Sequence, residues 1–324
     1  MSPKGSMSRR APFCALALAV ALVSFAACAT QDTDEAVAPA TPEVALIMKS
    51  LANEFFATMA DGARSHQAVA EEPYELVVNG TKNEGDLSQQ VALVEQMMTR
   101  GVDAIVIAPA DSKALIPVLA RAQRSGIAVV NIDNRLDTDA LVEAGVSIPF
   151  VGPDNREGAR AVGEVLNATL EPSSKVGIIE GIPTAFNSQE RRGGFEEAMA
   201  SRGHEVVDTQ SGGWEQAAAS VVAAGMLRAH PDLAAILCAN DSMALGAVAA
   251  ANQSGREGVT IVGFDNIRAV RDLVEEGRVL ATADQHADQL AVYGIEAALE
   301  ILQGETPADR KTPVDVVTRE GLLD

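Results

Sequence analysis

DLSQQVALVEQMMTRGVDAIVIAPAD, Asp86–Asp111, contains the pattern that decides the fold of this chain. Apolar residues recur at helical spacing over Asp86–Arg100, and the run Ala104–Ala108 is apolar throughout. A short apolar strand without alternation is typical of a parallel sheet that helices cover on both faces. We therefore predict a helix followed by a buried strand, with Asp111 as the N-cap of the next helix.

The same alternation continues on both sides of this stretch and divides into two halves near residue 150. Apolar runs of strand length lie at 44–48, 76–78, 104–108, 128–132, 176–179, 234–238 and 260–264. Helical patterns lie at 86–100, 111–125, 155–170, 188–202 and 215–229, with a last helix at 288–303 and a short segment at 312–318. Asp241 is expected to cap the helix after residue 238. The pattern predicts an α/β fold with two doubly wound parallel sheets.

Length and composition agree with two globular domains. The chain has 324 residues, of which 47% are hydrophobic and 22% are charged. Its 25 Lys+Arg against 45 Asp+Glu give a net charge of −20, which repels phosphate backbones and argues against a nucleic-acid partner.

The first 28 residues have the features of a secretory leader. Lys4, Arg9 and Arg10 supply positive charge, and an apolar run follows over 11–27. This run ends on Phe25-Ala26-Ala27-Cys28, which resembles a lipobox and predicts lipidation of Cys28. The alternative is an ordinary signal peptide that is cut after small residues.

Residues 29–43 are rich in Thr, Ala, Pro and acidic residues and show no periodicity. We predict a flexible tether there, between the anchor and the globular part. Beyond Cys28 the only cysteine is Cys238, within an apolar run, so neither a disulfide nor a cysteine metal site is expected. No cofactor and no metal is predicted.

Polar and aromatic residues follow the predicted strands, where ligands bind in open α/β sheets. They include carboxylates, amides, a guanidinium and three of the few aromatic residues in the chain. The candidate ligand-binding residues are Lys49, Asn53, Phe55, Phe56, Asp133, Asn134, Arg191, Trp214, Asn240, Asp265 and Gln285.

These residue types suit a neutral polyhydroxylated ligand. Asp accepts hydrogen bonds from hydroxyls, Arg donates them, and Asn and Gln do both. Aromatic rings pack on the apolar faces of a sugar. No His, Ser or Cys stands among them as a nucleophile. A single Asp or Asn after a strand is often only a helix cap, but several together predict a sugar site.

Four segments resemble the periplasmic sugar-binding proteins of bacterial ABC importers, in the ribose-binding-like branch of the type I periplasmic binding protein fold. They are Lys49–Gly62, Ala108–Ser112, Asn240–Gly246 and Val262–Asp265. The resemblance spans residues 43–317. It implies a monomer in the periplasm or at the cell surface that captures a monosaccharide or polyol and delivers it to an ABC transporter permease.

The resemblance also implies two lobes that are joined by a three-strand hinge and close over the ligand. The N-terminal lobe would comprise 44–153 plus 286–313, and the C-terminal lobe 154–285 plus 314–324. The sugar contacts that the resemblance implies are Asn53, Phe55, Phe56, Asp133, Arg191, Trp214, Asn240, Asp265 and Gln285.

Three positions depart from the ribose-binding pattern. Lys49 stands where ribose binders have a small hydroxyl residue, Asn134 stands where they have Arg, and Trp214 stands where Phe is usual. The first two predict a hydroxyl pattern other than that of ribose. We expect Lys49 to contact a ligand oxygen, with Asp133 as the nearest carboxylate; the alternative is a solvated Lys49 at the rim.

Other functions are less consistent with the residues. The related LacI-type repressors need an N-terminal DNA-binding segment, where this chain has a leader. Asp133 and Asp265 could imitate a glycosidase pair, but nothing in the sequence marks one of them as a raised-pKa acid, so we predict no enzyme. A binding protein that serves a chemoreceptor or a sensor kinase, rather than a transporter, stays open.

Overall fold

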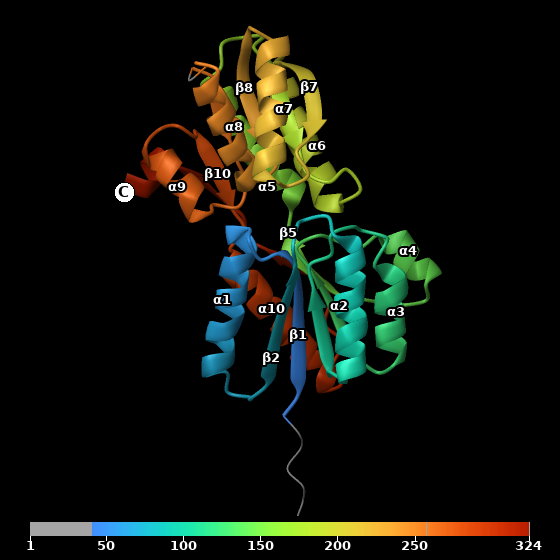
Figure 1. Ribbon diagram of the computed structural model, residues 1–324. Helices are drawn as coiled ribbons and strands as arrows, with labels where there is room; N and C mark the ends of the chain where they lie inside the picture. The colour runs from blue at the N-terminus through green and yellow to red at the C-terminus, as the bar shows by residue number, and fades with distance from the viewer. Residues whose placement is uncertain (1–40, 257, 324) are drawn as a thin grey trace, which may run out of the picture. The chain divides into compact units, whose positions relative to one another are not determined.

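The computed structural model describes residues 41–256 and 258–323, in which strands and helices alternate (Figure 1). The predicted leader, Cys28 and most of the predicted tether lie outside the described residues. The strands are β1 (Glu43–Ser50), β2 (Glu75–Thr81), β3 (Ala104–Ile107), β4 (Ala128–Ile132), β5 (Phe150–Pro153), β6 (Lys175–Glu180), β7 (Glu205–Ser211), β8 (Leu233–Cys238), β9 (Thr260–Val262), β10 (Ala281–Asp284), β11 (Arg310–Thr312) and β12 (Asp315–Thr318). The helices are α1 (Glu54–Val69), α2 (Leu87–Arg100), α3 (Ile116–Arg124), α4 (Thr138–Glu143), α5 (Asn155–Asn167), α6 (Phe186–Ser201), α7 (Gln216–Ala229), α8 (Asp241–Gln253), α9 (Arg268–Glu275), α10 (Ala287–Leu302) and α11 (Arg319–Leu323).

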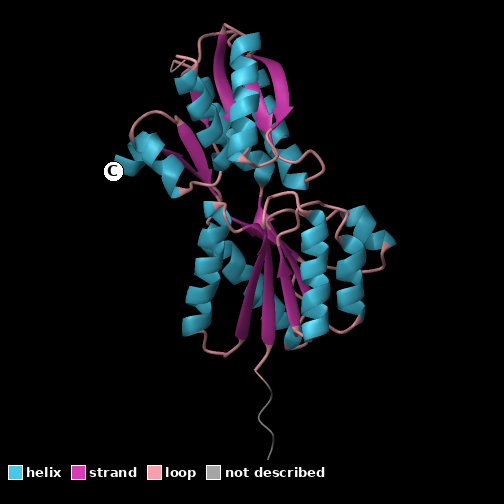
Figure 2. Ribbon diagram, in the orientation of Figure 1, coloured by secondary structure: helices cyan, strands magenta, loops and turns pink. Residues whose placement is uncertain are grey.

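The strands form two six-stranded sheets with helices around them (Figure 2). The first sheet has the order β11-β5-β4-β3-β1-β2, and all of its strands are parallel. The second has the order β12-β10-β9-β8-β6-β7, in which only β12 runs antiparallel to its neighbour. The predicted α/β fold with two doubly wound sheets is confirmed.

The chain passes between the two sheets three times. It leaves the first sheet after β5 and returns to it after β10, because α10 packs against β3 and β4 and β11 pairs with β5. It then leaves again between β11 and β12. The short segment that the sequence predicted at 312–318 is therefore two strands, one in each sheet.

Strand β1 shows why the strands are apolar without alternation. Val44, Leu46 and Met48 belong to one hydrophobic cluster, and Ala45 and Ile47 belong to another on the opposite face of the sheet. All five are fully buried. A strand that is covered on both faces needs apolar residues at every position.

Two predicted caps are wrong. Asp111 accepts from the backbone N–H groups of Lys113 and Ala114 in a turn, and α3 begins only at Ile116. The N-cap of α8 is Asn240, whose side chain accepts from the N–H of Met243. Asp241 is instead fully buried inside the lobe.

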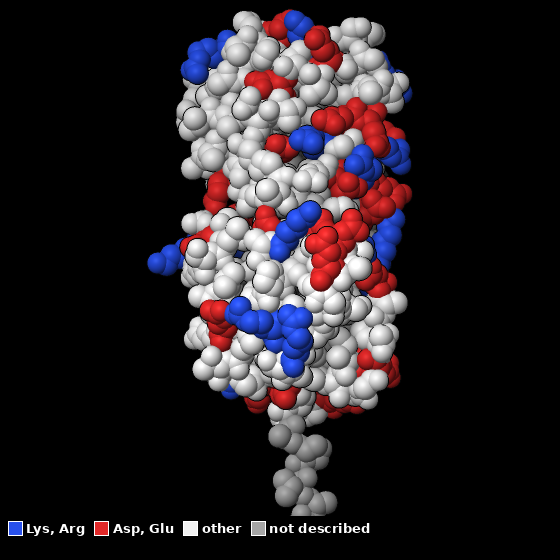
Figure 3. All heavy atoms as spheres, turned by 90° about the vertical axis from the view of Figure 1, so that its right-hand side faces the viewer, with Lys and Arg blue, Asp and Glu red and all other residues white. Residues whose placement is uncertain are grey.

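Acidic and basic side chains lie next to one another on the face shown in Figure 3. Ion pairs on the surface include Arg156 with Glu190 and Glu197, at 2.8 and 2.7 Å. Exposed pairs of this kind contribute little to stability. Among the described residues, no helix combines the length and the apolar character that crossing a bilayer requires.

Helices α5 and α6 pack closely because glycine lies at their contact. A Cβ on Gly194 would lie 2.2 Å from the backbone oxygen of Arg156.

Gly194→Ala should therefore lower the free energy of unfolding by about 1–3 kcal/mol, since the two backbones must separate. Gly225 in α7 has no such neighbour within 4 Å, and Gly225→Ala should raise it by about 0.5–1 kcal/mol. Urea unfolding of the two variants measures both changes in the free energy of unfolding. Equal changes in the two variants would contradict the close packing of α5 on α6.

Candidate ligand-binding site

One cavity brings together ten of the eleven predicted ligand-binding residues. It lies at the carboxyl ends of strands from both sheets, as expected for an α/β fold. Its lining residues are Lys49, Asn53, Phe55, Phe56, Glu84, Asp133, Asn187, Arg191, Trp214, Asn240, Asp265 and Gln285. The cavity is tight, with a volume of about 10 Å³, which is roughly the room that one water molecule needs.

The first turn of α1 positions the aromatic side chains of the first sheet. Asn53 is the N-cap, and its Oδ1 accepts from the N–H of Phe55 at 3.1 Å. Phe55 and Phe56 are buried and meet edge to face, with ring centroids 5.0 Å apart. The cap thus fixes the start of the helix and with it the place of both rings.

Lys49 is buried in the cavity rather than solvated at its rim. Its Nζ lies 3.1 Å from Asp133 Oδ2, and the two side chains are 4% and 2% exposed. The ammonium also lies 5.1 Å from the ring centroid of Phe56. Asp133 is the partner carboxylate that the sequence predicted, because an ammonium in a closed site needs an opposite charge beside it.

Arg191 is the second buried cation and is held on several sides. Its Nε donates to Asn155 Oδ1 at 2.7 Å, and its Nη1 donates to the carbonyl of Ala239 at 2.9 Å and to Asp265 Oδ1 at 3.3 Å. The guanidinium carbon lies 3.8 Å from the ring centroid of Phe264. Burial lowers the pKa of Arg191, and the Asp265 carboxylate opposes this.

Asp265 is shared between two donors. Gln285 Nε2 donates to its Oδ1 at 2.7 Å, beside the bond from Arg191. Burial raises the pKa of Asp265 to about 7 against the effect of the nearby guanidinium. Asp241 supports the turn that carries this residue, because its Oδ2 accepts from the N–H of Ile267 at 3.0 Å and its Oδ1 from Thr282 Oγ1 at 2.8 Å.

Trp214 lies against both cations. Its ring is 5.6 Å from Lys49 Nζ and 5.5 Å from the guanidinium carbon of Arg191. The indole fits because residue 181 is glycine: a Cβ there would lie 2.0 Å from the ring. The Trp that replaces the usual Phe therefore depends on Gly181.

The backbone is strained where it presents these side chains. Asp133, Trp214 and Asp265 have φ angles of 63°, 69° and 126°. Asn266 and His286, which follow Asp265 and Gln285, also have positive φ values, both 53°. Such conformations are costly for residues other than glycine and cluster at functional sites.

Four polar atoms of the lining are buried without a hydrogen-bond partner. One is Asp133 Oδ2, which has the Lys49 ammonium beside it at 3.1 Å, and the other three are Asn187 Oδ1, Trp214 Nε1 and Gln285 Oε1. A buried polar group without a partner destabilises the protein, so a ligand that supplies bonds to the last three atoms would bind favourably here. Two acceptors and one donor match hydroxyl groups, which both donate and accept.

The prediction for Asn134 differs from the others. Asn134 is fully buried but does not line the cavity. Its Nδ2 donates to the carbonyl of Pro109 at 3.0 Å, and its Oδ1 accepts from the N–H of Asn187 at 3.2 Å. Its amide is thus occupied by the protein, and the structure places it beside the site instead of in it.

Sequence reasoning missed two lining residues, Glu84 and Asn187. Asn187 precedes Arg191 by one turn of α6 and shares its face, so the spacing of four could have identified it. Glu84 lies in the loop after β2, several residues beyond the end of the predicted strand, and no comparable signal marks it.

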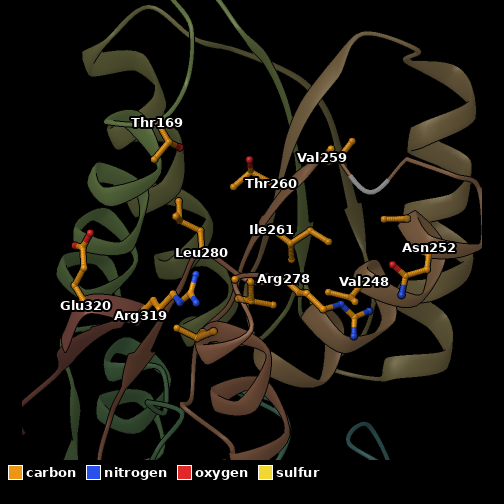
Figure 4. Close-up of a pocket in the computed structure, with 15 residues that line it drawn as sticks. Thr169, Val248, Asn252, Val259, Thr260, Ile261, Arg278, Leu280, Arg319 and Glu320 are labelled. Carbon is orange, nitrogen blue, oxygen red and sulfur yellow. The ribbon is translucent and has the colours of Figure 1, made fainter. Parts of the chain in front are cut away.

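A larger cavity, of about 840 Å³, shares no lining residue with this site. It lies near Thr260, Ile261 and Leu280, with Arg278 and Arg319 at its side (Figure 4). These residues mark the amino ends of β9 and β10, opposite the end where open α/β sheets bind ligands. Its size therefore does not make it the candidate site.

A family model for the periplasmic binding protein domain matches residues 44–306. The chain is 54% identical to the D-ribose/D-allose-binding protein of Pseudomonas aeruginosa, over 86% of this chain and 90% of that protein. It is 30% identical to the ribose import binding protein of Escherichia coli, over 90% and 94% of the two chains.

Two solved structures of ABC transporter solute-binding proteins are similar to this one. The protein from Burkholderia multivorans, which holds an unknown ligand, has a TM-score of 0.84 and 51% identity over 86% of this chain and 99% of its own. The protein from Actinobacillus succinogenes, with bound D-allose, has a TM-score of 0.81 and 35% identity over 86% and 98%.

Glu84 makes stability depend on pH in a defined direction. Burial raises its pKa from 4.5 to about 7, while Lys49 and the bond from Asn53 oppose the shift. A raised folded-state pKa gives stability that is complete below pH 4.5 and is lost as the pH rises through 7. Between pH 4.5 and 7 the free energy of unfolding of the wild type should fall, relative to Glu84→Gln, by at most about 3 kcal/mol.

Urea unfolding of both proteins at several pH values measures this difference. The raised pKa of Asp265 and the net negative charge act on both proteins, so they cancel in the comparison. Parallel curves for the two proteins would show that Glu84 does not titrate in this range.

Proposed function

Because this chain belongs to the family of the periplasmic binding protein domain, we propose that it captures D-allose and D-ribose between its two sheets. Membership of this family confirms the class of protein that the sequence predicted. The chain is a periplasmic solute-binding protein of the ABC sugar importers, with a type I fold of two lobes. Two of its relatives are a D-ribose/D-allose-binding protein and a ribose import binding protein.

The observation that carries the proposal is the set of unpartnered polar atoms beside two buried ion pairs. Asn187 Oδ1, Gln285 Oε1 and Trp214 Nε1 need partners, and an aldose can supply hydroxyls to all three. The aromatic rings of Phe56 and Trp214 offer apolar surface for its C–H faces. The curated relative with 54% identity is named for D-ribose and D-allose, and this supports the choice of sugars.

Lys49 favours D-allose as the tighter ligand. The two sugars differ by one hydroxymethyl group, and the ammonium is a longer, charged donor where ribose binders have a small hydroxyl residue. The departure at Lys49 argued against ribose in the sequence. The ribose in the name of the similar Pseudomonas aeruginosa protein is the reason to include it here.

The lobes proposed from the sequence are 44–153 plus 286–313 and 154–285 plus 314–324. Their support is that α10 and β11 belong with the first sheet and β12 with the second. The protein acts as a monomer in this proposal, since each chain carries a complete set of lining residues.

The proposal includes a lipid anchor at Cys28. The leader 1–28 ends on Phe25-Ala-Ala-Cys28, and the polar segment 29–43 follows it. A diacylated cysteine would hold the binding domain at a membrane surface, close to the permease.

A panel of monosaccharides tests the sugar specificity. Thermal unfolding of residues 41–324 should shift upward with D-allose and D-ribose, because a ligand at 100 times its Kd adds about 2.7 kcal/mol to stability. D-Glucose and D-galactose serve as comparison sugars.

Asp265→Asn should weaken binding about 10- to 100-fold by removing a buried charged acceptor.

Asp61→Asn is the matched control, because Asp61 is 77% exposed on α1 and lies outside the cavity. It should bind the sugars like the wild type. A wild-type protein that is stabilised by neither D-allose nor D-ribose would refute the proposed ligands.

Fractionation of cells tests the anchor. The native protein should be found with membranes, whereas Cys28→Ser should be soluble or keep its leader, since no thiol is left to acylate. Substituting Cys14, which lies inside the leader, should change nothing. Native protein that is wholly soluble would contradict the lipoprotein assignment and favour an ordinary signal peptide.

A further inference from the structure

Glu84 and Asn187 share an arrangement that the other lining residues lack. Each places its side chain on the cavity, and each donates its backbone N–H to a side chain from the opposite sheet. The N–H of Glu84 donates to Glu215 Oε1 at 3.0 Å, and the N–H of Asn187 donates to Asn134 Oδ1 at 3.2 Å. We call these two bonds the clasps.

We propose that Glu84 and Asn187 select the sugar with their side chains and hold the lobes closed with their N–H groups. One pair of residues thus links recognition of the ligand to closure of the cleft. The inference rests on the proposed function, because it concerns how the same cavity distinguishes sugars.

The side chain of Glu84 is placed to contact a ligand. Glu84 is 2% exposed, comes from the loop after β2 and lies beside the Lys49 end of the cavity. Asn53 Nδ2 donates to its Oε1 at 3.0 Å, which fixes the carboxyl group. The other oxygen has no protein hydrogen-bond donor in the described part of the chain, so a sugar hydroxyl is its natural partner.

The side chain of Asn187 faces the cavity from the other lobe. It is 2% exposed, and its Oδ1 is buried without a hydrogen-bond partner. Asn187 lies one turn before Arg191 on α6, so both reach the same ligand. A site with polar groups built for particular hydroxyls strongly disfavours sugars that lack them.

The lobes must move for a sugar to bind, because the closed cavity, with a volume of about 10 Å³, neither admits nor holds a monosaccharide. They therefore separate for entry and close again around a larger space, and the clasps are the contacts between the lobes that lie at the cavity. Further bonds cross between the lobes away from the ligand. Among them, the N–H of Phe186 donates to Ser112 Oγ at 2.9 Å, that of Arg268 donates to Glu54 Oε1 at 2.8 Å, and Lys311 Nζ donates to Glu157 Oε2 at 2.9 Å. Among the hydrogen bonds between the lobes in the described residues, only the clasps involve residues that also line the cavity.

The two roles can be separated by mutation. Glu84→Ala removes the carboxyl group but keeps the N–H of the clasp. Glu215→Ala removes the acceptor of the clasp but leaves the Glu84 side chain in place. Glu215 occupies the N-cap position of α7 and makes no side-chain capping bond there, so its truncation should not disturb the helix.

Isothermal titration calorimetry with D-allose and D-ribose distinguishes these roles. Glu84→Ala and Asn187→Ala should each change the ratio of the two Kd values by about 10-fold or more. Glu215→Ala should raise both Kd values by the same factor, about 10-fold, and leave their ratio unchanged. Glu171→Ala, an exposed carboxylate outside the cavity, should change neither value.

An unchanged ratio in both Glu84→Ala and Asn187→Ala would overturn the selective role of these side chains. A changed ratio, or no loss of affinity, in Glu215→Ala would overturn the clasp. Circular dichroism checks that each variant is folded, and Glu84→Gln replaces Glu84→Ala if the latter is not.

Failure of the proposed function gives a different result. In that case the wild type binds neither D-allose nor D-ribose, and the same variants are compared with the two panel sugars that it binds most tightly. The expected pattern is unchanged, because the inference depends on the position of the side chains and not on the identity of the aldose.

Discussion

Two positive charges buried in one cavity are the constraint on which the site depends. An isolated charge in a protein interior is very costly, so Lys49 and Arg191 are stable there only because Asp133 and Asp265 lie beside them. Each carboxylate sits at the carboxyl end of a strand, on backbone with positive φ. The two lobes thus contribute one ion pair each, and the polar atoms left over are the ones that a sugar can satisfy.

The sequence was sufficient for the two-sheet architecture and for most of the site because both follow from one rule. Parallel strands bury both faces, which makes them visible as apolar runs, and their carboxyl ends meet at one edge. Ten side chains at those ends do line one cavity. The rule does not say which way a side chain turns: Asn134 directly follows Asp133, yet its amide bonds to Pro109 and Asn187. Nor does it reach Glu84, which a loop brings back to the cavity, or β5, whose four residues are too short to stand out.

Trp214 illustrates how one change in a site depends on another. The indole is larger than the phenylalanine that is usual at this position, and it occupies space that any side chain at residue 181 would fill. Its Nε1–H adds a donor that phenylalanine cannot supply. Gly181, which directly follows β6, leaves the space that the ring occupies. The ring itself makes the contacts with Lys49 and Arg191.

The path of the chain between the sheets bears on the order in which the protein can fold. Helix α10 and strand β11 complete the first sheet, but they follow every strand of the second sheet except β12. Until those late residues arrive, Val106, Val130 and Ile132 lack their cover from α10, and β5 is an open edge. Contacts that close so large a loop form slowly, and exposed strand edges promote aggregation. A chain of this topology therefore has an incomplete first lobe until nearly its whole length is available for folding.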